Sequence, residues 1–332
     1  MQNHCSLFKN FLHAPFSLCA GKSCRRPSNA IIFLLSAWLY VLTMVLPVTA
    51  MASTPPVAGF SDMPLEYGKV IYRINENSPK QLYIIGISHR DPQTGRNGST
   101  TIQTQADIFR IGEWLHRNRE LQLLLPEGYF TAAETCPPAL AHSSSSQPDS
   151  YLLRQKLADE SRFVNAEMLL KENCRLRVSQ VEDRSIYDAV FQSLRNLKTT
   201  GTAQSSPQER LAQLQYLQEV RTAVLLQKIP AIVDRELNDG MIHNQSAMFT
   251  IGLNHLQDIV RYCQNNAIKI NSPDAGRMQP ANYTAELNLL KNGFGVTIII
   301  PRTLADDRRL LQMTNLDRIL LAYGRTGQEW LN

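Results

Sequence analysis

Acidic side chains are absent from the first 52 residues, where the basic residues are Lys9, Lys22, Arg25 and Arg26. An apolar block, Ala30–Pro47, leads to the small residues Ala50 and Ala52, which have the spacing that a signal peptidase requires. The block is short for a membrane-spanning helix, which needs about 20 apolar residues. We therefore interpret residues 1–52 as a signal peptide, with an uncleaved signal anchor as the alternative. The rest of the chain is expected to be exported, to a periplasmic or extracellular location.

The exported part also lacks an excess of charge of either sign. The full chain has 34 basic and 29 acidic residues, and the loss of four basic residues with the signal leaves 30 against 29, a net charge of +1. A surface without excess positive charge does not favour nucleic acid as a partner. We expect a peptide or small-molecule substrate instead, with membrane contact only through an uncleaved N-terminal segment.

Cysteine is scarce after residue 52, where only Cys136, Cys174 and Cys263 occur. An odd number in an exported protein allows one disulfide and one free thiol, or three buried thiols, and the sequence does not determine the pairing. Neither a Cys-x-x-Cys pair nor the short metallohydrolase signature His-Glu-x-x-His is present. The spacing of the cysteines does not indicate a metal site, and we assign them no catalytic role.

Apolar and amphipathic segments alternate after a polar leader, residues 53–68. Two apolar segments, Lys69–Asn75 and Gln81–Ile87, flank a turn sequence typical of a β-hairpin. Further strands are predicted at Leu121–Leu125, Leu176–Val181, Ala247–Leu253, Ala267–Ile270 and Val296–Ile300. Helices are predicted at Thr101–Asn118, Ser150–Cys174, Ser185–Lys198, Gln208–His243 with an interruption near Pro230, His255–Asn265 and Asn282–Lys291, and in the tail from Thr303.

This alternation predicts an α/β fold, with a largely parallel mixed sheet, an N-terminal β-hairpin and helices on both faces. Residues 69–332 are expected to form a single domain. A low-complexity linker, Thr199–Ser206, falls within a mostly helical stretch from about 150 to 245. We interpret this stretch as a helical insertion into the domain.

Two of the predicted strands end in the same motif, Gly86-x-x-His89 and Gly252-x-x-His255. In open α/β sheets, ligands bind beyond the carboxyl ends of the strands, where loops and helix starts converge. Glu127 follows a third strand, and Asp183 and Arg184 follow a fourth. We therefore expect these five side chains to lie at one edge of the sheet, where the motif glycines would permit close approach of a ligand or a neighbouring segment.

Two histidines and a carboxylate match the ligand set of a catalytic metal, with one position left for water. A metal lowers the pKa of that water, a carboxylate can take the proton, and an arginine can stabilise the oxyanion. We predict His89, His255 and Glu127 as ligands of a divalent ion, Mn, Co or Zn. The same groups can also act without a metal, with histidine as the general base.

The order of these motifs resembles the Tiki/TraB/GumN superfamily, which includes erythromycin-esterase-like and ChaN-like proteins. The resemblance covers roughly Lys69 to Ile300 and rests on KVIYRIN…QLYIIGISH, LQLLLPEG with Glu127, VDREL with Arg235 and MFTIGLNHLQDI with His255. VEDRSIYDAVF is similar to the Asp-Arg that begins a helix in TraB-type members, which implies that Arg184 lies near the site. Two departures from the family pattern are Pro126-Glu127-Gly128, and Glu236-Leu237-Asn238 after Arg235.

The resemblance implies a site but not one activity. Tiki-like members are regarded as metal-dependent proteases, erythromycin-esterase-like members resemble metal-independent hydrolases, and ChaN-like members bind haem. We expect an exported, metal-dependent hydrolase of peptide or ester bonds, in which Arg235 or Arg184 steadies the substrate. One alternative is a protein that binds haem or a metal without turnover, with contributions from Tyr129, Met241 and Met248. The other is a non-catalytic interaction protein.

Overall fold

The structure is a computed structural model, which describes residues 63–88, 99–130, 154–155, 157–158, 165–198, 206–273 and 282–329. The predicted signal peptide, His89 and Cys136 lie outside these residues. The pattern of contacts divides the chain into two units, Met1–Gly59 and Phe60–Asn332. The following description concerns the second unit. Among the described residues, no helix combines the length and the apolarity that crossing a membrane requires.

Six strands of the described chain form one sheet, in the order β1-β8-β2-β5-β3-β4. Their bounds are β1 Gly68–Ile74, β2 Lys80–Ile87, β3 Leu123–Pro126, β4 Arg177–Val178, β5 Ser246–Gly252 and β8 Phe294–Pro301. All neighbouring pairs are parallel except β1 with β8. The predicted α/β class and the largely parallel mixed sheet are therefore confirmed.

The predicted N-terminal β-hairpin is wrong, because β8 lies between β1 and β2. The turn that joins β1 to β2 passes over the start of β8. Asn75 Nδ2 donates a hydrogen bond to the Phe294 carbonyl at 3.4 Å, and Ser78 Oγ donates to the Gly293 carbonyl at 2.5 Å. This turn needs to span only two strand spacings of about 4.8 Å each. Turn residues typical of a hairpin therefore also suit strands that are second neighbours.

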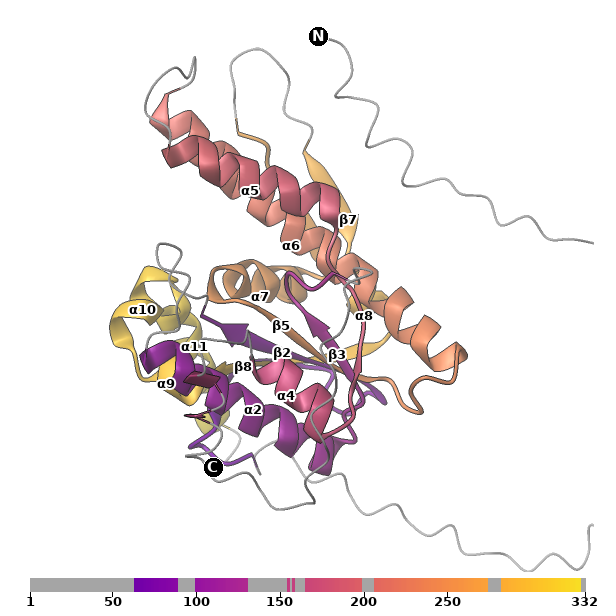
Figure 1. Ribbon diagram of the computed structural model, residues 1–332. Coiled ribbons are helices and arrows are strands. Elements are labelled where there is room, and N and C mark those ends of the chain that lie inside the picture. Colours follow the sequence, from indigo (N-terminus) through magenta and orange to yellow (C-terminus); the bar gives the residue numbers. More distant parts are fainter. Residues whose placement is uncertain are drawn as a thin grey trace, which may run out of the picture. The chain divides into compact units, whose positions relative to one another are not determined.

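Helices cover both faces of the sheet, as predicted (Figure 1). Alternate side chains of β2 enter two separate cores, since neighbouring residues of a strand point to opposite faces. Leu82 and Ile84 pack in the core beneath α6 (Pro207–Asn238) and α7 (Leu256–Asn265). Tyr83 and Ile85 pack in the core beneath α2 (Ser99–Arg119) and α4 (Ala166–Asn173).

Helix α6 begins with a capping box, in which Ser206 Oγ accepts from the Glu209 amide and Glu209 Oε2 accepts from the Ser206 amide. Pro207 occupies the first turn, where the N–H that proline lacks would have no partner within the helix. The predicted interruption near Pro230 is wrong. The helix continues through Pro230, where the surrounding residues Ile229 and Val233 are fully buried in the core. This packing offsets the cost of an interior proline.

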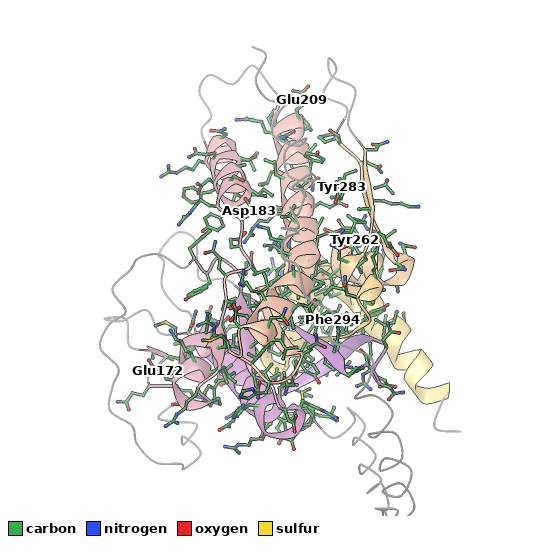
Figure 2. All side chains as sticks on the ribbon, turned by 90° about the vertical axis from the view of Figure 1, so that its right-hand side faces the viewer. Glu172, Asp183, Glu209, Tyr262, Tyr283 and Phe294 are labelled. Carbon is green, nitrogen blue, oxygen red and sulfur yellow. The ribbon has the colours of Figure 1, made fainter. Side chains whose placement is uncertain are left out.

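Helix α5 (Arg184–Lys198) precedes α6 and packs against it. Figure 2 shows Asp183 where α5 begins and Glu209 at the start of α6, well away from Asp183. The two helices therefore run antiparallel, and the start of α5 lies beside the middle of α6. This arrangement decides which residues of α6 reach the edge of the sheet.

The segment before β8 differs from the predicted helix over Asn282–Lys291. Tyr283–Glu286 forms strand β7, and only Asn288–Lys291 forms a helix, α8. Strand β7 pairs antiparallel with β6 (Ala267–Ile270) in a separate two-stranded sheet, and this pairing supplies hydrogen bonds that override the helical pattern. The tail is helical as predicted, with α9 at Arg302–Ala305, α10 at Arg308–Met313 and α11 at Leu316–Glu329.

Candidate functional site

Glu127 and His255 leave adjacent parallel strands at the carboxyl edge of the sheet. Strands β3 and β5 are paired through Pro126 and Thr250, and the Glu127 amide extends the ladder by donating to the Thr250 carbonyl at 3.0 Å. After β5 the chain turns through the short helix η3 (Leu253–His255) into α7. Nε2 of His255 lies 3.7 Å from Oε1 of Glu127, and the side chains are only 7% and 5% exposed. Two of the predicted site residues are therefore brought together in the interior.

The first histidine motif approaches the same edge. Ile87, the last residue of β2, pairs with Gly252, the last residue of β5. Ser88 is the last described residue before His89, which lies outside the described residues. The glycines of the two Gly-x-x-His motifs therefore lie on neighbouring parallel strands, offset by one residue.

Gly86 has a specific packing role in this arrangement. A Cβ atom at this position would lie 2.6 Å from Leu253 Cδ2 and 2.8 Å from Leu256 Cδ1. Any larger side chain would therefore force the side chains of Leu253 in η3 and Leu256 in α7 to move. The glycine of the first motif thus fixes how closely the second motif packs against it.

Arg221 of α6 joins Glu127 to a second buried carboxylate, Glu182. Nη1 of Arg221 donates to Oε1 of Glu127 at 2.7 Å, and Nε donates to Oε1 of Glu182 at 3.0 Å. Nη2 also donates to Oε2 of Glu182, which forms a bidentate pair. Glu182 accepts in addition from the Gly128 amide at 3.0 Å. The guanidinium therefore holds two carboxylates that come from different strand ends.

The electrostatics of this cluster are dominated by the carboxylates. Burial lowers the pKa of Arg221, but the hydrogen bonds and charges of Glu182 and Glu127 outweigh burial and raise it above its ordinary value. The side chains are 7%, 5% and 0% exposed for Arg221, Glu127 and Glu182. Burying ion pairs of this kind costs desolvation energy, and apolar residues of similar volume often stabilise a fold as well or better. The cluster is therefore a candidate functional site.

Both oxygens of Glu127 are used. Oε1 accepts from Arg221 and faces His255, while Oε2 accepts from the Gly252 amide at 2.6 Å. These contacts fix the plane of the carboxylate relative to the imidazole. Thr222, the next residue on α6, contacts the other side of the ring, with its Oγ1 2.6 Å from Nδ1 of His255.

Asp183 follows Glu182 of this cluster, but both of its carboxylate oxygens accept hydrogen bonds from other residues. Its Oδ1 accepts from the Ser185 and Ile186 amides, at 3.1 and 3.4 Å, and so caps the start of α5. Its Oδ2 accepts from Lys228 Nζ at 2.8 Å. Burial raises the pKa of Asp183. The hydrogen bonds from Lys228 and Ser185 lower the pKa by more than burial raises it, so the net shift is downward.

Arg184, which the resemblance implied to lie near the site, is exposed at the first turn of α5. Its guanidinium carbon lies 3.7 Å from the centroid of the Phe130 ring. Phe130 meets Tyr187 edge-to-face at 5.2 Å, and the Arg221 guanidinium lies 5.3 Å from the Tyr187 centroid. A pair of rings therefore separates the exposed Arg184 from the buried Arg221.

Arg235 is not placed with the other predicted residues. Its side chain is 56% exposed and donates to Glu236 Oε1 at 3.2 Å. Fourteen residues separate it from Arg221 on α6, a distance of about 21 Å along the helix axis. The guanidinium that contacts Glu127 belongs to Arg221, and the catalytic role predicted for Arg235 is not supported by its position.

Sequence reasoning missed Arg221, Glu182 and Thr222. A signal for Arg221 was present, since this charged residue lies between Val220 and the apolar run Ala223–Leu226 of α6. Glu182 directly precedes Asp183 at a strand end, so the position after the strand indicated Glu182 as well as Asp183. No pattern distinguished Thr222.

Cys174 and Cys263 are free thiols, so a disulfide between them is excluded. Burial raises the pKa of Cys174 to about 11, with Glu113 adding to the shift and Arg117 opposing it. Burial alone raises the pKa of Cys263 to about 12. Both thiols are therefore protonated at neutral pH, which agrees with a role in packing.

Two of the predicted metal ligands, His255 and Glu127, have a spacing that suits a shared ion. In a tetrahedral site with ligand distances of about 2.1 Å, two ligand atoms are about 3.4 Å apart. The 3.7 Å separation of His255 Nε2 and Glu127 Oε1 fits such a pair. The described residues contain no group of three or more His, Cys, Asp and Glu side chains that could hold a metal, and the predicted third ligand, His89, lies outside them.

Of the three residues named for the haem alternative, Tyr129 follows Glu127 by two residues, but the two methionines do not converge on His255. Met248 is fully buried within β5, in the core beneath α2 and α4. Met241 is 50% exposed and follows the C-terminal end of α6, far along that helix from Thr222. Neither residue lies at the carboxyl edge of the sheet.

Comparison of the chain with protein-family profiles, with curated proteins and with solved structures finds no match. The resemblance to the Tiki/TraB/GumN superfamily therefore stays a prediction that rests on the motifs. The class of protein that the fold and the site define is an α/β protein with a buried His-Glu-Arg-Glu cluster at the carboxyl edge of its sheet.

Proposed function

We propose that this chain is an exported hydrolase of peptide or ester bonds, with its reaction centre at His255 and Glu127. The observation that carries the proposal is the buried contact between these two side chains, 3.7 Å apart at the carboxyl edge of the sheet. Their placement agrees with the general location of ligand sites in open α/β folds. Arg221 and Thr222 support the pair from α6.

In this proposal, His255 accepts a proton from the attacking water through Nε2. Glu127 then stabilises the imidazolium across the 3.7 Å separation, since an opposite charge at this distance favours the charged ring. Arg221 keeps Glu127 in this position through the 2.7 Å hydrogen bond from Nη1. Proton transfer of this kind typically contributes about 10²–10⁴-fold to the rate.

A divalent metal fits the same centre. His255 and Glu127 would hold it, together with His89, and it would supply hydroxide at neutral pH by lowering the pKa of a bound water. The ring nitrogen of His255 and the carboxylate oxygen of Glu127 are donors that such an ion accepts. Metal-dependent and metal-free hydrolysis use the same side chains and are distinguished by chelation.

Arg184 is the residue that we assign to substrate recognition. It is exposed, and Phe130 beneath its guanidinium restricts the conformations that the side chain can adopt. Phe130 follows Glu127 by three residues, so Arg184 stands close to the reaction centre. A planar guanidinium suits a substrate carboxylate or carbonyl oxygen.

The decisive experiment screens the purified protein against peptide and chromogenic ester libraries, before and after chelation, with Mn, Co and Zn added back. His255→Gln and Glu127→Gln are expected to lower kcat/KM by at least about 10²-fold. His243→Gln is the matched control, because His243 is exposed and lies at the opposite end of β5. Equal activity of His255→Gln and His243→Gln would overturn the proposal.

Export is tested separately by determining the N-terminus of the protein in cell fractions. A mature chain that begins near Ser53 outside the cytoplasm is expected from the sequence pattern of residues 1–52. Full-length protein retained in the cytoplasm would contradict this part of the proposal without affecting the reaction centre.

A further inference from the structure

Thr222 is fully buried and contacts the imidazole of His255 directly. Its Oγ1 lies 2.6 Å from Nδ1 of the ring, and the two residues come from α6 and from the end of η3. The same hydroxyl lies 2.9 Å from the backbone carbonyl of Gln218, one turn earlier on α6. The hydroxyl therefore has two partners and only one hydrogen to share between them.

The position of each hydrogen between Gln218, Thr222 and His255 follows from which atoms can donate and which can only accept. The Gln218 carbonyl can only accept, so the Thr222 hydroxyl hydrogen is used in the 2.9 Å hydrogen bond to it. The 2.6 Å contact then requires a hydrogen on Nδ1 of His255, which donates to the hydroxyl oxygen. The opposite assignment would leave two acceptor oxygens, those of Thr222 and Gln218, in contact without a hydrogen between them. Such a contact in the interior is unfavourable.

Glu127 favours the opposite tautomer, because a hydrogen on Nε2 would point toward a carboxylate. The separation of 3.7 Å between Nε2 and Oε1 is too long for a hydrogen bond, whereas the Thr222 contact is within range. Oε1 already accepts from Arg221, and this hydrogen bond holds it in place. The closer contact decides the competition in favour of a hydrogen on Nδ1.

We propose that Thr222 is a positioning residue that holds neutral His255 as the Nδ1–H tautomer, with the lone pair of Nε2 directed toward Glu127. Consecutive residues of α6 thus orient the two halves of the centre, since Arg221 fixes the carboxylate and Thr222 fixes the ring. The tautomer is inferred from the contacts of the ring with Thr222 and Glu127, while its catalytic significance rests on the proposed hydrolase function. A general base or a metal ligand requires the lone pair on Nε2.

The test uses the full protein labelled with ¹⁵N-histidine, freed of metal by chelation, at a pH where the His255 ring is neutral. Two-dimensional ¹H–¹⁵N spectra distinguish a ring nitrogen that carries hydrogen from one with a lone pair, and the spectrum of His255→Gln assigns the signals. The wild type is expected to show a hydrogen-bearing Nδ1 and a lone-pair Nε2. A hydrogen-bearing Nε2 in the wild type would overturn the inference.

Two variants connect the tautomer to Thr222. Thr222→Ser retains the hydroxyl and is expected to retain the Nδ1–H signal, whereas Thr222→Val, of nearly equal volume, is expected to shift the population toward Nε2–H. An unchanged tautomer in a folded Thr222→Val variant would overturn the role of Thr222. Should Thr222→Val not fold, the wild-type spectrum still decides the tautomer, and loss of the Nδ1–H signal in Thr222→Ser would count against Thr222.

Kinetics on a substrate found by screening give a second measurement. Thr222→Val is expected to lower kcat by about 10–100-fold, as typically follows loss of a residue that orients a catalytic or ligating histidine, with little change in KM and recovery in Thr222→Ser. A protein that shows the expected tautomer but no hydrolysis would overturn the proposed function while supporting this inference. Unchanged kcat in Thr222→Val would overturn the catalytic role of Thr222 while leaving the hydrolase function intact.

Discussion

Arg221 and Glu127 form a buried ion pair at 2.7 Å, although 94 residues separate them in the chain. The Arg221→Met variant leaves Glu127 and Glu182 in the interior without their guanidinium. The free energy of unfolding is expected to fall by about 3–5 kcal/mol, the usual cost of removing one partner of a buried pair. Urea-induced unfolding followed by circular dichroism measures this change.

The matched control is Arg235→Met on the same helix. This side chain is 56% exposed, and its partner Glu236 also accepts hydrogen bonds from Arg177 and Ser179. A change within about 0.5 kcal/mol is expected for an exposed position of this kind. Similar losses in the two variants would show that the Arg221 cluster contributes no more than a surface pair.

Gly86→Ala is expected to destabilise the fold by about 1–3 kcal/mol through overpacking. The added Cβ would lie 2.6 Å from Leu253 Cδ2, on the turn that carries His255. Truncation of Leu253 to Ala in the same chain removes the atom that is struck first. The double-mutant cycle should therefore show a favourable coupling of at least about 0.5 kcal/mol. Strictly additive effects in thermal or urea unfolding would mean that the turn moves freely away from β2.

Asp258 makes the stability depend on pH. Burial raises its pKa from 3.8 to about 6, with the charge of Arg261 opposing the shift and that of Glu219 adding to it. The folded state therefore binds this proton more tightly than the unfolded state, and the free energy of unfolding falls as pH rises from about 4 to 6. Between these limits the wild type is expected to lose up to about 3 kcal/mol relative to Asp258→Asn.

Urea unfolding of wild type and Asp258→Asn at several pH values between 4 and 7 checks this expectation. Asp188→Asn, at an exposed position of α5, is the control and should follow the wild-type curve. Parallel curves for wild type and Asp258→Asn would exclude a raised pKa at this position.

Cys174 and Cys263 are expected to resist alkylation in the folded protein. With pKa values raised to about 11 and about 12, their thiolate fractions at pH 8 are lower than that of an ordinary cysteine by about 10²-fold or more. Iodoacetamide labelling, followed by peptide mapping with and without urea, measures the rate at each residue. Labelling of Cys174 in the native protein at the unfolded rate would show that the side chain is accessible as a thiolate.

The strands and helices near the centre were predictable because their signals are local. The apolar run before Gly86 and its repetition before Gly252 indicate strands covered on both faces, and both lie in the middle of the sheet. Since the carboxyl ends of parallel strands share one edge, the proximity of Glu127 and His255 also followed from the sequence.

The position of β8 did not follow, because the turn Asn75–Pro79 is compatible with neighbouring strands and with strands that have one strand between them. The antiparallel pairing of β6 with β7 was likewise hidden, since the pattern of Tyr283–Glu286 alone does not show that β6 offers a free edge. Both outcomes depend on hydrogen bonds between segments far apart in the sequence.

The sequence by itself determined the class of fold and the strand ends that deliver Glu127 and His255. Only the tertiary structure decided that Arg221, and not Arg235, reaches them, and that Thr222 contacts the ring. The long helix α6 has many polar residues along one side. Which of them contacts the sheet depends on the position of the helix along its own axis relative to the sheet. That position is set by packing against both α5 and the core, which no local pattern records.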